Sequence, residues 1–278
     1  MMMQFFTTTQ VASLSITQIS MMTVGQMGQF TPMDIEDMPM YQFGGLTAAQ
    51  MGGLSTAQIG AFTPMEIGGM SMKQFGGLTA AQMGAFSTAQ VRAFTPAEVG
   101  AMTAKQFGGF TPAQIGTLTP SQMAALNPAV IGAMTTKQIG AMGPATLGSL
   151  TTAQFSALTP VDIGSLSTAQ MRALATAQVG SMSARMVAAL TASQIGTMTT
   201  AEIGALTPRQ MGGLTQQQLG GMNSSDLTAL TASQIAGLSP HQLYGMYQNN
   251  HNQSGFFSTT QLGNLSVGQK HGYMGIPS

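Results

Sequence analysis

The sequence contains no cysteine and no tryptophan, and few of its residues are charged. Without cysteine the chain has no disulfide, no thiolate nucleophile and no thiolate metal ligand, and its redox compartment cannot be inferred. Charged residues make up 6% of the sequence, against about 25% in typical soluble proteins, so an ordinary globular surface is not expected. Lys plus Arg equals Asp plus Glu at 8 each. Because no excess positive charge is available to bind phosphates, we expect no nucleic-acid partner.

Long apolar runs are also absent. Ser, Thr and Gln recur every few residues, and no window approaches the roughly 18 apolar residues of a membrane-spanning helix. The first residues, MMMQFFTTTQ, contain no basic region followed by an apolar stretch, so a conventional secretory signal is not expected. We therefore expect no membrane span, and an extracellular or cell-surface location would require a non-classical export route.

Most of the sequence is one repeated eight-residue phrase. LTAAQMGG at Leu46 is followed by LSTAQIGA and FTPMEIGG, and the phrase continues without insertion or deletion from Phe6 to Gly245, which makes 30 octads (240 ÷ 8). Position one is Leu, Met or Phe in every octad, and position six is always apolar. Units of this kind bury their apolar faces against their neighbours. We therefore expect a solenoid over residues 6–245, after a lead of residues 1–5.

The other positions carry helix start and stop signals. Position two is Ser or Thr in 25 octads and position five is Gln, Glu or Asp in 27, which is the spacing of the capping box at a helix start. Ten of the 12 prolines occupy position three, where the first residue of a helix tolerates proline. Gly occupies position seven in 19 octads, which suggests a left-handed residue that ends the helix. The pattern predicts an all-α solenoid in which each octad is a capping box plus about one helical turn.

Three alternatives remain beside this prediction. A single continuous helix is disfavoured because eight residues advance about 80° beyond two turns, so the apolar residues of successive octads would not lie on one face of the helix. Disorder is disfavoured because a fixed apolar pair in every repeat is what disordered chains lack. A β-solenoid is the main alternative, although it favours β-branched residues and this sequence is rich in Ala, Gln and Met.

A longer period, of four octads, overlies the eight-residue phrase. MPMYQFGG, MSMKQFGG and MTAKQFGG begin four octads apart, at Met38, Met70 and Met102, which defines a 32-residue super-repeat. Acids and lysines recur on this spacing: Asp34, Glu66, Glu98, Asp162 and Asp226, and Lys73, Lys105 and Lys137. If four octads make one turn, these side chains form two columns of opposite charge. Otherwise the super-repeat is only the duplicated unit, and a turn of two octads is also compatible with the sequence.

The register breaks after Gly245. Residues 246–256, MYQNNHNQSGF, precede two degenerate octads at 257–272, so the tail of residues 246–278 contains three extra residues (257 − 246 = 11 = 8 + 3). Histidine and tyrosine concentrate in or beside it: His241, His251, His271, Tyr244, Tyr247 and Tyr273. We expect this tail to be a separate segment that acts as a terminal cap, an anchor or an assembly surface.

We expect no catalytic, cofactor-binding or metal-binding residue. Six of the eight acids fall at position five: Asp34, Glu66, Glu98, Asp162, Glu202 and Asp226. There they replace Gln in the capping box, whereas acid–base catalysis needs groups that converge in a pocket. Most of the 26 methionines share positions one and six with Leu and Ile, which indicates core filling rather than copper binding. The histidines are scattered in the polar tail, and the cations at position four are expected on solvated faces: Lys73, Lys105, Lys137, Arg185 and Arg209.

The phrase L-[ST]-x-x-Q-[IV]-x-A has a known counterpart. FTPAQIGTL from Phe110 and LTASQIGTM from Leu190 resemble the octapeptide arrays of some large bacterial surface proteins labelled haemagglutinin or haem-utilisation proteins. The resemblance covers about residues 6–245 and concerns the structural repeat. It implies a bacterial, extracellular origin and supplies no catalytic residues.

These observations favour a non-enzymatic structural protein. A net charge near zero removes the repulsion that keeps proteins apart, and a solenoid with an open end can continue into another copy. We expect self-association into fibres, filaments or a surface layer, with the chain itself as partner. The alternative is an adhesin-like, partner-binding scaffold that uses the solenoid face or the C-terminal tail to bind a protein.

Overall fold

The structure is a computed structural model that describes residues 7–249 and 257–274. The described residues form 32 short helices and no strand. This confirms the all-α solenoid and contradicts the β-solenoid alternative. None of the described helices is long and apolar enough to cross a membrane. The helices fall into two compact units, Met1–Met142 and Gly143–Ser278.

The described part of the first unit consists of helices of four to six residues. They are α1 (Thr8–Ala12), α2 (Ile16–Met21), α3 (Val24–Met27), α4 (Pro32–Glu36), α5 (Met40–Phe43), α6 (Ala48–Gly53), α7 (Thr56–Gly60), α8 (Pro64–Gly68), α9 (Met72–Gly76), α10 (Ala80–Ala85), α11 (Thr88–Ala93), α12 (Pro96–Gly100), α13 (Ala104–Phe107), α14 (Pro112–Ile115), α15 (Pro120–Ala124), α16 (Pro128–Gly132) and α17 (Thr136–Ala141).

The described part of the second unit continues with the same kind of helix. Its helices are α18 (Pro144–Gly148), α19 (Thr152–Phe155), α20 (Pro160–Ser165), α21 (Thr168–Met171), α22 (Thr176–Gly180), α23 (Ala184–Ala188), α24 (Ala192–Ile195), α25 (Thr200–Gly204), α26 (Pro208–Gly212), α27 (Gln216–Leu219), α28 (Ser224–Ala229), α29 (Ala232–Ala236), α30 (Pro240–Asn249), α31 (Thr259–Leu262) and α32 (Val267–Tyr273).

Capping boxes start most of these helices, as predicted. In α6 the Thr47 backbone N–H donates to Gln50 Oε1 (2.7 Å), and the Gln50 backbone N–H donates to Thr47 Oγ1 (3.2 Å). Such pairs satisfy the orphan N–H groups of a helix start. Proline at position three is the first helical residue, for example Pro64 in α8. Where the N-cap is Pro39 or Gly143, no side chain caps the helix.

The predicted core positions are buried in the described octads from Phe30 on. Ile59 at position six is 0% exposed and Phe62 at position one is 3% exposed. Phenylalanines of different octads also meet edge to face, as Phe43 and Phe62 do with ring centroids 4.9 Å apart. A helix of one turn is not stable alone because nucleation is costly. This shared apolar interior, at about 1.5 to 3 kcal/mol for each large buried side chain, makes the short helices stable.

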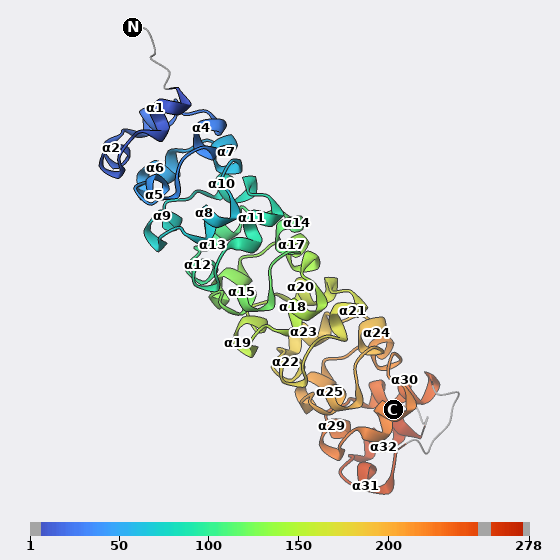
Figure 1. The fold of residues 1–278 in the computed structure, drawn as a ribbon. Coiled ribbons are helices and arrows are strands. Elements are labelled where there is room, and N and C mark those ends of the chain that lie inside the picture. Colours follow the sequence, from blue (N-terminus) through green and yellow to red (C-terminus); the bar gives the residue numbers. More distant parts are fainter. Residues whose placement is uncertain (1–6, 250–256, 275–278) are drawn as a thin grey trace. The chain divides into compact units, whose positions relative to one another are not determined.

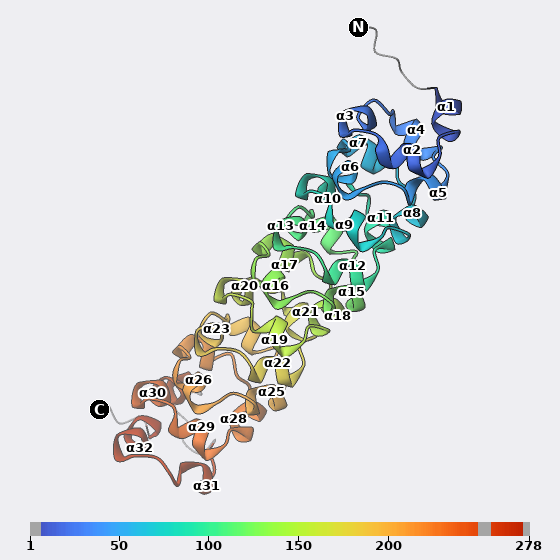
Figure 2. The same cartoon turned by 90° about the vertical axis from the view of Figure 1, so that its left-hand side faces the viewer.

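Stacked neighbours are three helices apart. In the first unit α1, α4, α7 and α10 follow one another (Figure 1). In the second unit α20, α23, α26 and α29 do the same (Figure 2). The glutamine at position five forms hydrogen bonds between successive turns. Gln82 Nε2, for example, donates to the carbonyls of Met51 (2.7 Å) and Leu54 (2.8 Å), which lie 31 and 28 residues earlier.

One turn therefore contains more than three and fewer than four octads. The two alternatives that the sequence left open, four or two octads per turn, do not match the structure, because stacked helices are three octads apart and the glutamine bonds join residues 28 to 31 positions apart. The four-octad period therefore exists in the sequence but does not match one turn of the solenoid. The charged residues that recur on this period do not stack into columns. The position-five acids are buried, as Glu66 and Glu98 show, so they form no exposed column.

The interpretation of the glycines as left-handed helix stops was also wrong. No glycine in the described chain has a φ in the positive range that favours glycine, and the residue after α9, Gly77, has φ −76° and ψ −19°. The glycines instead allow close approach between turns. A Cβ on Gly77 would lie 2.1 Å from the carbonyl oxygen of Ala48, and a Cβ on Gly52 would lie 2.6 Å from that of Gly77.

The two degenerate octads of residues 257–272 stack on the array. α31 packs against α29, and α32 packs against α30. Gln261 Nε2 donates to the carbonyls of Leu227 and Leu230, 34 and 31 residues earlier. Both separations exceed those inside the array by three, the number of extra residues in the sequence. The octads of residues 257–272 therefore keep the register of the octads that they pack against.

Candidate interaction surfaces

Position five has a function that the sequence analysis did not identify. Its side-chain oxygen belongs to the capping box, but its amide nitrogen is a donor to the previous turn. Gln58 Nε2, for instance, donates to the carbonyls of Met27 (2.9 Å) and Phe30 (2.8 Å). A signal was present in the sequence, since 21 of the 27 polar residues at this position are Gln and six are acids. A capping box alone needs only an acceptor, so the preference for an amide indicates a second, donating role.

The first three glutamines of the array do not make this inter-turn bond. Gln10, Gln18 and Gln26 each accept the N-cap backbone N–H through Oε1 at 2.8 Å. Their side chains are exposed, and among the described residues their Nε2 atoms have no acceptor.

Apolar groups lie beside these amides. The position-one residues Leu14 and Met22 are only half-buried, unlike their counterparts in later octads, and Met21 is 79% exposed. The first described turn thus presents amide donors and apolar side chains of a kind that later turns bury.

The last described turn presents the complementary acceptors. Inside the array, glutamine at position five donates to carbonyls of positions six and one in the preceding turn, as Gln242 does to those of Met211 and Leu214. The corresponding carbonyls of the last two described octads are those of Leu262 and Leu265, and no glutamine of the described residues reaches them.

The acids at position five lie where the sequence predicts, in capping boxes. Glu98 Oε2 accepts the backbone N–H of Thr95 (2.6 Å) and its hydroxyl (2.8 Å), and the side chain is 2% exposed. Two of these acids keep a buried oxygen without a partner, Glu98 Oε1 and Asp226 Oδ1. Such an oxygen occupies the place of the amide nitrogen of Gln, and buried acceptors without partners cost free energy.

A third buried oxygen without a partner has a different cause. Gln42 Oε1 accepts no hydrogen bond because the N-cap of its helix is Pro39, whose nitrogen carries no hydrogen. The amide nitrogen of Gln42 still donates to the carbonyls of Val11, Ala12 and Leu14. The inter-turn bond is therefore independent of the capping box.

The acidic and histidine side chains that the structure describes do not converge on one metal site. In the described ranges 7–249 and 257–274, no three His, Asp or Glu side chains lie close enough to hold a metal ion. His241 is exposed and His271 is half-buried, and His251 lies outside the described residues. Tyr273 stacks on Phe257 with ring centroids 5.4 Å apart and accepts the Phe257 backbone N–H through its hydroxyl (3.3 Å).

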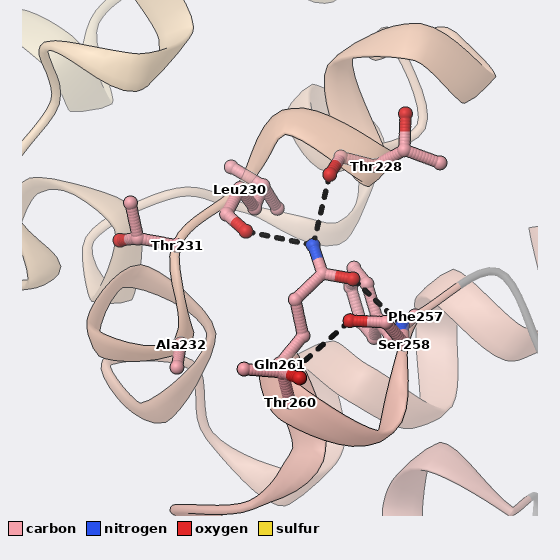
Figure 3. Close-up of a pocket in the computed structure, with 8 residues that line it drawn as sticks. All are labelled: Thr228, Leu230, Thr231, Ala232, Phe257, Ser258, Thr260 and Gln261. Atoms are coloured by element: carbon pink, nitrogen blue, oxygen red, sulfur yellow. Dashed lines mark hydrogen bonds between the residues drawn. The ribbon is translucent and has the colours of Figure 1, made fainter.

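Grooves recur between stacked helices. The one between α29 and α31 has a volume of about 540 Å³ and is lined by Leu230, Thr231, Ala232 and Phe257, among others. In Figure 3, Gln261 extends across it to the carbonyls of Thr228 and Leu230. Equivalent grooves lie between α23 and α26, at about 430 Å³, and between α24 and α27, at about 270 Å³. All three use the same octad positions, so their shape follows from the repeat and their chemistry from the side chains at position four.

These features define a repeat protein built as an all-α solenoid. Comparison with known families agrees, because the model of the ALTTAQ repeat matches residues 120–152 and 131–168. The name of that repeat contains the central phrase of the octad, and LTTAQ stands in this chain from Leu150. No curated protein matches the chain.

Proposed function

We propose that this chain is a non-enzymatic structural repeat protein that self-associates by stacking the first turn of one copy on the last turn of another. The observation that supports it is the exposed set of amides on Gln10, Gln18 and Gln26. Inside the array, such an amide is buried against carbonyls one turn away, as for Gln82. The carbonyls of Leu262 and Leu265 offer acceptors of the same kind in a second copy.

Charge and polarity favour the same contact. The net charge is zero and only 6% of residues are charged, so repulsion between copies is small. A head-to-tail contact that does not close on itself generates open filaments. We place these filaments at a bacterial cell surface, in line with the resemblance of the octads to arrays in surface proteins.

The test changes the amide donors without disturbing the capping boxes. The triple variant Gln10→Glu, Gln18→Glu, Gln26→Glu keeps an acceptor for each N-cap, as Glu66 does in α8, but removes the donors and adds charge. We expect the unchanged protein to form filaments in negative-stain electron microscopy and to sediment faster as concentration rises. The variant should remain monomeric.

A matched control separates lost donors from added charge. Ala113→Glu, Ser121→Glu and Ser193→Glu add the same three charges at exposed position-four residues, where acids suit the first helical turn. This control should assemble nearly as well as the unchanged protein. A monodisperse unchanged protein at high concentration would contradict self-association, and equal loss in both triple variants would contradict the stacking contact.

A partner-binding scaffold is the second candidate, and the groove of Figure 3 favours it. This groove is the largest of the three compared above and lies where the tail meets the array. Exposed Thr260 lines it, so Thr260→Trp would block it at the surface. Loss of binding to a protein partner in this variant, with unchanged assembly, would favour the scaffold over the filament.

A further inference from the structure

The groove between α23 and α26 differs chemically from the others. Two arginines line it from adjacent turns, Arg185 on α23 and Arg209 on α26. The equivalent groove between α24 and α27 has Gln217 in the place of Arg209, and Ser193 occupies the octad position of Arg185. No acidic residue lines the groove between α23 and α26. Two positive charges therefore share one concave surface in a chain that has only 8 basic residues.

Neither arginine is engaged by the rest of the described protein. Both side chains are exposed, and neither has a hydrogen-bond or ion-pair partner in residues 7–249 or 257–274. An arginine presents five N–H donors in a planar fork and matches oxyanions in a bidentate manner. The two forks are therefore available to a ligand.

Two hydroxyl groups in the groove, those of Ser183 and Thr207, donate no hydrogen bond to any described residue. In many octads the N-cap hydroxyl donates to the position-five oxygen, as Ser167 Oγ does to Gln170 Oε1 at 3.0 Å. Position five is Met186 in the octad of Ser183, so only a thioether sulfur is present there, and it accepts the Ser183 backbone N–H (3.3 Å). Thr207 accepts the Gln210 backbone N–H at 3.3 Å, and its hydroxyl donates to no described residue.

We propose that this groove binds a phosphate monoester of a small polar molecule, with Arg185 and Arg209 holding the phosphate. The hydroxyls of Ser183 and Thr207 supply further donors. Oxyanions bound by arginine make charge-assisted hydrogen bonds, which are the strong ones. The volume of about 430 Å³ exceeds that of a phosphate group and falls in the range of small-ligand sites, which leaves room for a sugar-sized substituent. This site does not depend on the proposed self-association.

The test is isothermal titration of the full chain with glucose 6-phosphate, inorganic phosphate and glucose at low ionic strength. We expect glucose 6-phosphate to bind most tightly, inorganic phosphate to bind more weakly, and glucose not to bind. Arg185→Gln and Arg209→Gln should each weaken glucose 6-phosphate binding about tenfold, and the double variant should abolish it. Circular dichroism would verify that the variants remain folded, since both side chains are exposed.

Two controls distinguish a site from general charge attraction. Arg92→Gln removes an exposed arginine outside the groove and should change the affinity less than twofold. Ser193→Arg with Gln217→Arg should create a second site in the neighbouring groove and double the stoichiometry. The proposal is overturned if the unchanged protein binds neither phosphate at millimolar concentration, if acetate binds as tightly as phosphate, or if Arg92→Gln weakens binding as much as the groove variants.

Discussion

At the scale of single residues, position five has two roles at once. Its oxygen accepts from the N-cap, and its nitrogen, when present, donates to the previous turn. Gln90 makes both kinds of bond, because its Oε1 accepts the Ser87 backbone N–H (2.6 Å) and its Nε2 donates to the Phe62 carbonyl (2.6 Å). Glutamine is therefore the residue that satisfies every polar group at this position.

Glu98→Gln is expected to stabilise the protein. The buried Oε1 of Glu98 has no partner. Glutamines of other octads donate to carbonyls 31 and 28 residues earlier, which for position 98 are those of Ile67 and Met70. An amide would supply donors to them, and relief of a buried unsatisfied group is worth about 1 to 3 kcal/mol. The urea midpoint of unfolding should therefore rise.

The control for this substitution is Glu36→Gln. Glu36 is exposed, so its replacement removes the same charge without changing a buried group and should shift the midpoint little. An unchanged or lower midpoint for Glu98→Gln would contradict the two roles of position five.

Residue-level prediction from the sequence succeeded where the chemistry was local. Capping between Thr47 and Gln50 involves neighbours three residues apart, so spacing alone predicts it. The donation from Gln82 to Met51 joins residues 31 positions apart. No local rule describes that bond, and only the preference for Gln over Glu indicated it.

At the scale of the helix and its neighbour, small residues at the end of most octads set how closely turns approach. Position eight of one octad meets position three of the octad three earlier, as Gly77 meets Ala48. The neighbour of Gly53 at position three is larger, and a Cβ on Gly53 would lie 2.1 Å from Cγ1 of Val24. A left-handed helix stop and a close contact between turns both favour glycine. The sequence alone does not distinguish these two causes, which is why it led to the wrong explanation.

Two adjacent glycines at the end of α9, Gly76 and Gly77, distinguish a helix stop from a close contact between turns as the reason for glycine. Gly77→Ala would place a Cβ 2.1 Å from the Ala48 carbonyl oxygen, and the turns would have to move apart at a cost of about 1 to 3 kcal/mol. Gly76→Ala meets nothing within 4 Å, and alanine favours a helix over glycine by up to about 1 kcal/mol. Thermal unfolding should show a lower Tm for Gly77→Ala and an equal or higher Tm for Gly76→Ala. Equal shifts in both variants would argue against close approach as the reason for glycine.

At the scale of the whole chain, equivalence of the octads is the organising principle. The number of repeats and the all-α class follow from the sequence, because the apolar and capping positions never slip over 30 octads (240 ÷ 8). The number of octads per turn does not follow, because it depends on how short helices pack at an angle to one another. The four-octad period was a misleading guide, since duplication copies sequence units whatever the pitch of the solenoid.

The tail shows how the register responds to extra residues. Three residues are added between Gly245 and Phe257. Gln269 Nε2 still donates to the carbonyl of Leu238 (2.7 Å), which lies 31 residues earlier, whereas Gln242 reaches the equivalent carbonyl of Leu214 28 residues earlier. The inter-turn bonds are thus specific for octad positions and not for a fixed separation along the chain. Added residues are compatible with stacking when the following octads can resume their positions.

Insertions within the first unit test this principle. The first variant carries a second copy of residues 110–117, placed after Thr117. Gln114 donates to a position-six carbonyl 31 residues earlier and to a position-one carbonyl 28 residues earlier. After the insertion, each later glutamine of this unit still finds carbonyls of these two positions at the same separations. One alanine placed between Gly116 and Thr117, in the short connection from α14 to α15, moves the partners of Gln122 and Gln138 by one position. We expect the octad insertion to change the Tm little and to add helical signal in circular dichroism. The single alanine should lower the Tm much more, because each displaced glutamine leaves buried polar groups unsatisfied at about 1 to 3 kcal/mol.

A longer insertion distinguishes the octad from the super-repeat as the unit of register. Insertion of four octads should be tolerated as well as insertion of one and no better, because a turn is not four octads. The Tm of both variants should therefore be similar, while the added helical signal in circular dichroism should scale with the number of octads inserted. Equal damage from the single alanine and the single octad would contradict a register set by octad positions. A clear advantage of four octads over one would instead restore the four-octad turn, because only then would the longer insertion return every helix to its original neighbour.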